Sequence, residues 1–306
     1  MKRAISSACT ATVIFTLAAA GCTTDTGDRP HPDTAAASPA RELTDAERAL
    51  LRRAEELLVK QCMEAEGFTY WAAPTAVVEK NKAYAYVLDD VAWAKRNGYG
   101  GKLETKAVKA RLNDPNLAYL EKLPARERAR YDRTLDGDET GRMLSVDMPT
   151  GGTVRTPADS CRATAAERLY GSYETWFRVK KTTDSLTPLY VPVLKREKRF
   201  VTALKAWSTC MRTAGHTYAD PPAVRAGLEE LTDGLSDAEA HAVEVELAVD
   251  EATCAKRTSL AGTARALEGE YRAEKLPRRY RETIATRRLL EAAALDRAED
   301  ITGSQH

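Results

Sequence analysis

Cysteines are the residues of this chain with the most chemical potential, because a thiol can form a disulfide, bind a metal or accept a lipid. The chain has six cysteines and four histidines. A zinc site would need a Cys-x-x-Cys pair or a cluster of Cys and His, and the sequence has neither. We therefore expect no metal and no cofactor. The expected roles of the cysteines are signal-peptide processing with lipid attachment, and disulfide formation. The six residues are Cys9, Cys22, Cys62, Cys161, Cys210 and Cys254.

The N-terminus has the features of a secretory signal peptide over residues 1–21. Lys2 and Arg3 precede an apolar run, and small residues precede Cys22. The junction Ala-Ala-Gly-Cys resembles a bacterial lipobox, in which the signal is removed before the cysteine and its thiol receives a lipid, expected to be palmitate. The alternative is an ordinary secretory signal followed by a chance cysteine. Lipidation of Cys22 would place the protein on the outer face of the cytoplasmic membrane.

Residues 22–42 would then be the lipidated cysteine and a disordered tether, because they are polar, small and proline-containing. The whole chain has 46 Lys and Arg against 45 Asp and Glu, and removal of Lys2 and Arg3 leaves a net charge near −1. No basic block stands out, so nucleic acid is not an expected partner. The expected partners are the membrane, through the anchor, and a cell-envelope protein or small ligand.

One phrase, Cys-Met-x-x-x-Gly-x-Thr-Tyr, occurs at positions 62 to 70 and again at 210 to 218. Glycine tolerates the left-handed backbone that closes a helix, so Gly67 and Gly215 each predict a helix end of the Schellman type. In that motif the residue after the glycine contacts the residue three places inside the helix. The predicted contacts are Met63 with Phe68 and Met211 with His216.

The phrase also predicts the disulfides. An exported protein meets an oxidising environment, so its four remaining cysteines favour two bridges. Each copy of the phrase is followed by a second cysteine, Cys161 in the first copy and Cys254 in the second. Repeat logic pairs Cys62 with Cys161 and Cys210 with Cys254, although four cysteines allow three pairings.

The predicted fold is all-α, built as two related helical halves that are each closed by a disulfide. The halves span 43–198 and 199–306. Extra material lies at about 72–110 and 141–157 of the first half, and Pro-Thr-Gly-Gly between β-prone runs in the latter predicts a small hairpin. Nearly all of the rest has apolar residues at helical spacing, including one long run from Ser236 to about Asp300 that is broken at Leu276-Pro277.

The first helix is predicted to start at Thr44, because Thr-Asp-Ala-Glu is a capping box. Apolar residues then recur at steps of three and four, which predicts one buried stripe. Its members are Leu50, Ala54, Leu57, Leu58, Cys62 and Ala65.

The stretches YVLDDVAWAKRNGYG, DPNLAYLEKLPARERARYDRTLDG and AWSTCMRTAGHTY, with the second cysteine of each copy, resemble secreted lipoproteins of actinobacteria that have no assigned activity. The resemblance covers most of the chain after the tether. It implies a cell-surface location and a helical, disulfide-bonded fold. It brings over no activity and no catalytic residue.

Two loops resemble ion-binding or phosphate-binding sequences. In DGDETGRMLSVD, Asp136, Asp138, Thr140 and Asp147 fall at ligand positions of a calcium loop, although a strand rather than a helix follows. A polar loop after a helix is the simpler interpretation, and the sequence leaves calcium open. The stretch NGYGGK lacks the first glycine and the Ser or Thr of a phosphate loop, and we reject that assignment.

The remaining candidate surface is aromatic. Tyr70, Trp71, Trp93 and Tyr99 lie in or directly before the first-half extra material, and the second half has no equivalent cluster. Aromatic clusters form ligand grooves and partner surfaces, but they also form the core of small subdomains.

The sequence contains no nucleophile motif and no catalytic histidine motif, so we do not expect an enzyme. The leading hypothesis is a membrane-anchored extracytoplasmic lipoprotein with a binding or scaffold role. The alternative is an extracellular enzyme whose carboxylates come together only in the fold, and would show as a pocket with convergent acids. A spacer within the cell wall is a third hypothesis.

Overall fold

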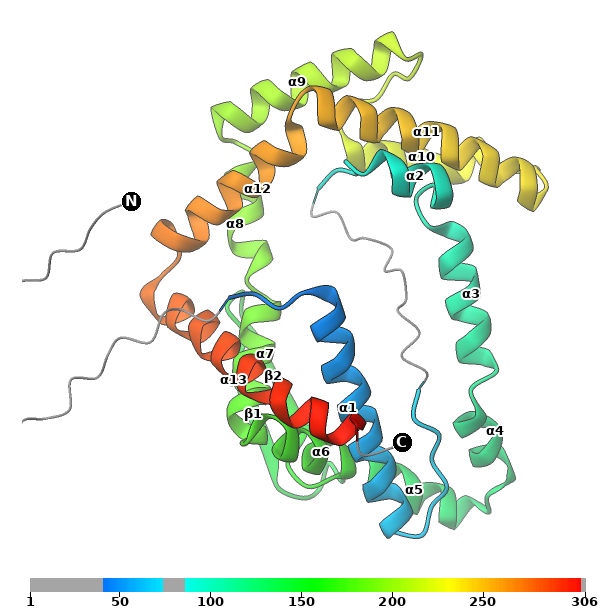
Figure 1. Cartoon of the computed structure of the whole chain (residues 1–306), viewed down its shortest axis with the longest axis vertical. Coiled ribbons are helices and arrows are strands. Elements are labelled where there is room, and N and C mark those ends of the chain that lie inside the picture. The colour runs from blue at the N-terminus through cyan, green and yellow to red at the C-terminus, as the bar shows by residue number, and fades with distance from the viewer. Residues whose placement is uncertain (1–40, 74–85, 304–306) are drawn as a thin grey trace, which may run out of the picture. The chain divides into compact units, whose positions relative to one another are not determined.

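The computed structural model describes residues 41–73 and 86–303, and these residues are mostly helical (Figure 1). The predicted signal at 1–21, Cys22 and the tether up to residue 40 lie outside the described residues. In chain order the elements are α1 (Asp45–Ala65), α2 (Val91–Asn97), α3 (Gly101–Leu112), α4 (Pro115–Lys122), α5 (Ala125–Asp136), β1 (Met143–Asp147), β2 (Thr153–Pro157), α6 (Cys161–Tyr170), α7 (Tyr173–Asp184), α8 (Thr187–Leu194), α9 (Lys198–Thr213), α10 (Pro221–Thr232), α11 (Asp237–Arg257), α12 (Leu260–Glu270), the π-helical turn η1 (Tyr271–Lys275) and α13 (Arg278–Gly303).

Helix α1 starts where its capping box predicts. The Thr44 hydroxyl accepts from the Glu47 N–H at 3.2 Å, and the Glu47 carboxylate accepts from the Thr44 N–H at 2.7 Å. The buried stripe is partly as predicted: the leucines and Ala54 point inward, but Ala65 is exposed. The last buried residue of the helix is Met63, two positions before Ala65. The residues of α1 that are buried are Leu51, Ala54, Leu57, Leu58, Val59 and Met63.

Both copies of the repeated phrase close a helix in the predicted way. Gly67 has φ +84° and Gly215 has φ +93°, the left-handed conformation of a helix C-terminus. The N–H of Phe68 donates to the Met63 carbonyl at 2.9 Å, and the N–H of His216 donates to the Met211 carbonyl at the same distance. Both methionines are fully buried. The Schellman prediction is therefore confirmed in both halves.

The two disulfides are those that the repeat predicts. Cys62 is joined to Cys161 with their Cα atoms 5.5 Å apart, and Cys210 is joined to Cys254 with their Cα atoms 5.6 Å apart. The bridges close sequence separations of 99 and 44 residues. In the chain-entropy model loops of these lengths contribute up to about 4–5 kcal/mol each.

The fold holds two main hydrophobic cores, and they do not follow the two halves of the sequence. The first core joins α1, α5, α6 and α7 with α13 from the C-terminal end of the chain. Figure 1 shows α13 in red beside α1 in blue. The second core joins α8, α9, α11 and α12, and it takes in Val87 from the first-half extra material. Each core therefore contains elements from both sides of the 198/199 boundary.

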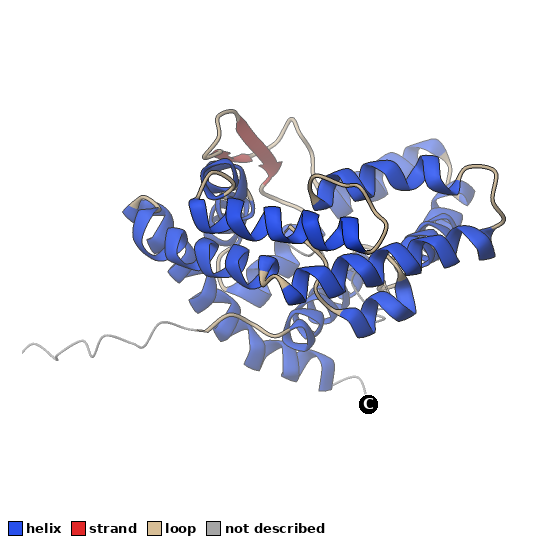
Figure 2. Cartoon of the chain, turned by 90° about the horizontal axis from the view of Figure 1, so that it is seen from above, coloured by secondary structure: helices blue, strands red, loops and turns tan. Residues whose placement is uncertain are grey.

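Residues 143–157 form the predicted hairpin, the strand pair drawn in Figure 2. Strands β1 and β2 are antiparallel, with Met143 opposite Pro157 and Asp147 opposite Thr153. Gly151 and Gly152 both have positive φ, as a tight turn requires. The hairpin packs on α7 through Leu144 and Phe177.

The long apolar run after Ser236 is divided into several helices. The break at Leu276-Pro277 is present, but the chain also turns at Ser259, which has φ +55°. This second break separates α11 from α12 and lets both pack on α9. Among the described residues, no helix combines the length and the apolar character needed to cross a bilayer.

Candidate functional site

Helix α11 carries two buried carboxylates that organise the candidate site. Glu251 is fully buried and Glu244 is 7 % exposed. One oxygen of Glu251 accepts from the Leu88 N–H at 3.0 Å, and the other accepts from the Tyr99 hydroxyl at 2.7 Å. Arg225 of α10 lies 3.4 Å from the same carboxylate and donates to the Tyr86 carbonyl at 2.9 Å. Glu251 and Arg225 therefore fasten the segment from Tyr86 to Tyr99 onto the second core.

The spacing of Glu244 and Glu251 along α11 places both acids on the same side of the helix. Glu244 and Glu251 are seven residues apart, which is about two turns, so they lie on one face of the helix. Ala248 and Ala252 share this face and are fully buried. Their small side chains allow α2 to approach closely, and Trp93 packs over them in a separate small core.

Glu244 caps helix α3 from outside. One of its oxygens accepts from the Tyr99 N–H at 2.7 Å and from the Gly101 N–H at 2.9 Å. Gly98 and Gly100 have positive φ, and a Cβ on Gly98 would lie 2.7 Å from the Glu244 side chain. The loop Asn-Gly-Tyr-Gly-Gly, which fails as a phosphate loop, thus binds a carboxylate of its own chain.

Burial shifts the pKa values of Glu251 and Tyr99. Burial raises the pKa of Glu251 above its ordinary value, and the hydrogen bonds from Tyr99 and Leu88 offset part of that rise. Burial also raises the pKa of Tyr99, and the neighbouring Glu251 raises it further. The phenol therefore stays protonated and acts as a donor.

A pocket of 570 Å³ opens beside this joint, between α3, α10 and α11 (labelled in Figure 1). Three lysines of α3 line it, Lys102, Lys106 and Lys109, and all three are exposed. No ion pair or side-chain hydrogen bond links any of them to another described residue. His241 of α11 also lines the pocket, and its Nδ1 is buried without a hydrogen bond among the described residues, 3.6 Å from the Glu244 carboxylate.

The structure divides the four predicted aromatic residues between two places. Tyr70 belongs to the first core and donates to Glu56 at 3.2 Å, while Trp71 lies at the edge of this core, 42 % exposed, with its ring 5.8 Å from that of Tyr119. Trp93 is buried against α11, and Tyr99 is half-buried at Glu251. These four side chains do not form one aromatic surface.

The calcium-loop residues are directed to different partners. Asp136 pairs with Arg162 at 2.6 Å, and Asp147 accepts from the Thr153 hydroxyl at 2.7 Å across the hairpin. Asp138 accepts from both the hydroxyl and the N–H of Thr140, and these hydrogen bonds lower its pKa. In the described part of the chain, no three His, Cys, Asp or Glu side chains are grouped so that they could hold a metal ion.

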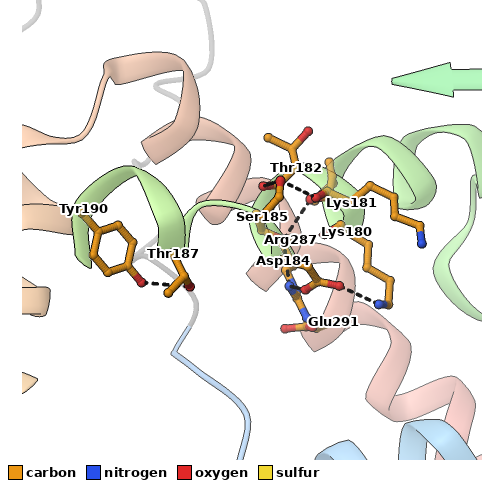
Figure 3. Close-up of polar contacts among 11 residues, drawn as sticks. Lys180, Lys181, Thr182, Asp184, Ser185, Thr187, Tyr190, Arg287 and Glu291 are labelled. Carbon is orange, nitrogen blue, oxygen red and sulfur yellow. Dashed lines mark hydrogen bonds and ion pairs between the residues drawn. The ribbon is translucent and has the colours of Figure 1, made fainter. Parts of the chain in front are cut away.

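A second polar cluster joins α7 to α13, and Figure 3 shows Asp184 between Lys180 and Arg287. Lys180 donates to Asp184 at 2.7 Å and Arg287 donates to it at 2.6 Å. Arg287 also donates to Glu291 at 2.8 Å. Although burial opposes the charged form, the hydrogen bonds from Lys180 and Arg287 lower the pKa of Asp184. Every charge in this cluster has a partner, so the cluster fastens two helices and offers no free group to a ligand.

The sequence hypothesis missed the two acids of α11. Glu244 and Glu251 are two of many charged residues in a helical stretch, and their spacing alone is compatible with a solvated face. A signal was present, because Ala248 and Ala252 lie between and beside them on the same face. The three glycines around Tyr99 gave a second signal, since such a loop needs an acceptor for its amides.

Both acids of α11 are engaged by other groups of the protein. An acid or base in catalysis must face a substrate, and both oxygens of Glu251 are held by groups of the protein itself. One oxygen of Glu244 takes two backbone amides. Among the described residues that line the pocket, the three lysines of α3 form no ion pair with the acids.

Comparisons of the chain with protein-family models, curated proteins and solved structures found no match.

Proposed function

We propose that the mature chain is a lipid-anchored protein of the outer face of the cytoplasmic membrane, and that it acts by binding a ligand or a cell-envelope partner. The lipobox-like junction at Cys22 supports the anchor. The two cystines fit an oxidising compartment outside the cytoplasm. A stretched tether of about 20 residues would let the folded part stand up to roughly 65–70 Å from the anchor.

One observation carries the binding role: buried hydrogen bonds fasten the first-half extra material to α11, and beside it lies a pocket whose lysines have no ion-pair partner among the described residues. Glu244 and Glu251 hold the loop at Tyr99, so α3 starts in a fixed position. A rigid joint beside an open 570 Å³ pocket is the arrangement of a binding site, because it lowers the entropy cost of ordering the contact residues.

The anchor is tested in the native cell with a single substitution. Cys22→Ser removes the thiol that would carry the lipid, and we expect the variant to leave the membrane fraction and to lose label from a palmitate analogue. Cys9→Ser is the matched control, since that cysteine lies inside the predicted signal. Retention of the Cys22→Ser chain in the membrane with undiminished label would contradict the anchor.

The binding role is tested by crosslinking on intact cells, followed by identification of what is captured. We expect a defined envelope component to be captured by the wild type and lost with Gly98→Val, which displaces the Glu244 side chain that positions α3. Gly262→Val is the control, because a Cβ at Gly262 meets no neighbour within 4 Å. Capture of neighbouring lipoproteins alone, unchanged by Gly98→Val, would contradict a binding function.

A further inference from the structure

The pocket between α3, α10 and α11 has an unusual charge pattern. Lys102, Lys106 and Lys109 are three and four residues apart, so they lie on one face of α3 and cover about 10 Å along its axis. Like charges at this spacing repel one another and destabilise an isolated helix. Helix α3 has no buried residue that would offset this cost by packing. An anion in the pocket would remove the repulsion.

The second wall of the pocket is formed by the start of α11. Asp237 and His241 lie in the first two turns of this helix, where the helix dipole presents its positive end. The His241 Nδ1 is buried and lies 3.6 Å from the Glu244 carboxylate, so this nitrogen is directed to Glu244. Thr105 places a hydroxyl among the lysines.

Two carboxylates face the pocket as well, and they set its charge. Asp237 lies at the exposed rim, and Glu244 lies at the inner end. One oxygen of Glu244 accepts from the Tyr99 and Gly101 amides, which stabilise its negative charge within the protein. Three lysines outnumber the two acids, and the lysines lie along one side.

We propose that this pocket binds a phosphate-bearing ligand, with Lys102, Lys106 and Lys109 on its phosphate oxygens. The inference deepens the proposed binding function and rests on it. Lysine acts as a point charge toward phosphate, and three of them spread over about 10 Å suit a ligand with more than one anionic oxygen group. Leu228 and Ala240 add an apolar patch for the rest of the ligand. A free phosphate ester and a phospholipid headgroup share this chemistry.

The test uses the mature chain from residue 22 with Cys22→Ser, so that no anchor affects the result. Two probes separate the sources: pyrophosphate, followed by calorimetry at low salt, and vesicles of phosphatidylglycerol, followed by sedimentation against phosphatidylcholine vesicles. We expect at least one probe to bind, and binding to weaken about tenfold or more in K102A/K106A/K109A, because each lost lysine removes a direct phosphate contact.

The matched control is K122A/K205A/K256A, which removes the same charge from exposed lysines elsewhere. Its affinity for the probe should stay within about twofold of the wild type. Binding of pyrophosphate identifies a free phosphate ester, and binding of the anionic vesicles alone identifies a headgroup. Failure of both probes, or equal loss in the two triple variants, would overturn the proposal. Crosslinked capture on cells that survives K102A/K106A/K109A would leave the binding function standing and reject this pocket.

Discussion

The two disulfide-bonded halves end a helix in the same way but differ in the segment that a carboxylate of each half holds. In the first half, Glu56 of α1 accepts from Tyr70 and from the Ala73 N–H, so the exit segment returns to its own helix. In the second half, Glu251 accepts from Leu88 and Tyr99, which come from the first half of the sequence. The repeated phrase therefore specifies a local turn, and carboxylates outside the phrase hold different segments in the two halves.

The second cysteines show the same contrast. Cys161 is the first residue of α6, after the hairpin has interrupted the helical path that begins with α5. Cys254 lies in the last turn of α11, a single helix of 21 residues. The two bridges therefore have nearly the same Cα separation, although the second cysteine lies at the start of a helix in one half and at the end of a helix in the other. The disulfide requires only the local distance and direction of two Cβ atoms.

Removal of each bridge gives the largest expected effect. We expect C62A/C161A to cost up to about 4.7 kcal/mol and C210A/C254A up to about 4 kcal/mol of unfolding free energy, because the longer loop restricts the unfolded chain more. Urea unfolding followed by circular dichroism measures both. A clearly larger loss from the shorter bridge would show that the second core depends on its cystine for native packing and not for loop entropy.

Substitution of Glu251 and of Glu56 should reveal a larger difference in stability loss between the two halves. Glu251→Ala leaves buried donors of Leu88 and Tyr99 without an acceptor, and we expect a loss of about 2–4 kcal/mol. Glu56→Ala should cost only about 1 kcal/mol, because Glu56 is half-buried and water can replace it.

Glu251→Gln is the matched control for the first of these variants. Its amide oxygen can accept from the Leu88 N–H and its amino group can donate to the Tyr99 oxygen, so we expect a loss below about 1 kcal/mol. Equal losses from the Ala and Gln variants would mean that the charge of Glu251, and not its two hydrogen bonds, stabilises the joint.

Substitution of the two closing glycines should give smaller and equal effects. Gly67→Ala and Gly215→Ala each place a Cβ at positive φ, and neither Cβ meets an atom within 4 Å. We therefore expect about 1 kcal/mol from each, the cost of the left-handed conformation alone. Thermal melting of the two variants checks this. A difference above about 1 kcal/mol would show that the shared turn carries tertiary contacts in one half.

Local features of the chain could be predicted from sequence with good accuracy. The capping box at Thr44, the closures at Gly67 and Gly215 and the hairpin each depend on a few neighbouring residues, and all are present. The disulfide pairing followed because the repeat supplied the missing long-range information.

The assignment of elements to cores could not be predicted in this way. Helix α13 packs on α1, although more than 200 residues separate them. Ala294 and Ala298 of α13 belong to the first core, while Tyr280 and Ile284 near its start pack against the second core. The site at α11 depends on the same long-range choice, because Tyr99 meets Glu251 only when α2 lies on that helix.

The smallest expected effects are opposite dependences of stability on pH in the two cores. The pKa of Asp184 is lowered in the folded state, so its contribution is present above its unfolded pKa of about 3.9 and is lost as the pH falls toward the folded value. The pKa of Glu251 is raised, so the folded state holds its proton longer than the unfolded chain, and stability falls as the pH rises from about 4.3 through the folded value.

Urea unfolding between about pH 3 and pH 7 should separate these two dependences. In a plot of unfolding free energy against pH, Asp184→Asn should flatten the part at acid pH. Glu251→Gln should flatten the part above about pH 4.3. Each change should be less than roughly 1.4 kcal/mol per unit of pKa shift. Glu121→Gln, at an exposed position of α4, should leave both sides unchanged. If Glu251→Gln instead steepened the fall above pH 4.3, the ionised carboxylate would be the form that the Tyr99 and Arg225 contacts stabilise, and Arg225 would be its essential partner.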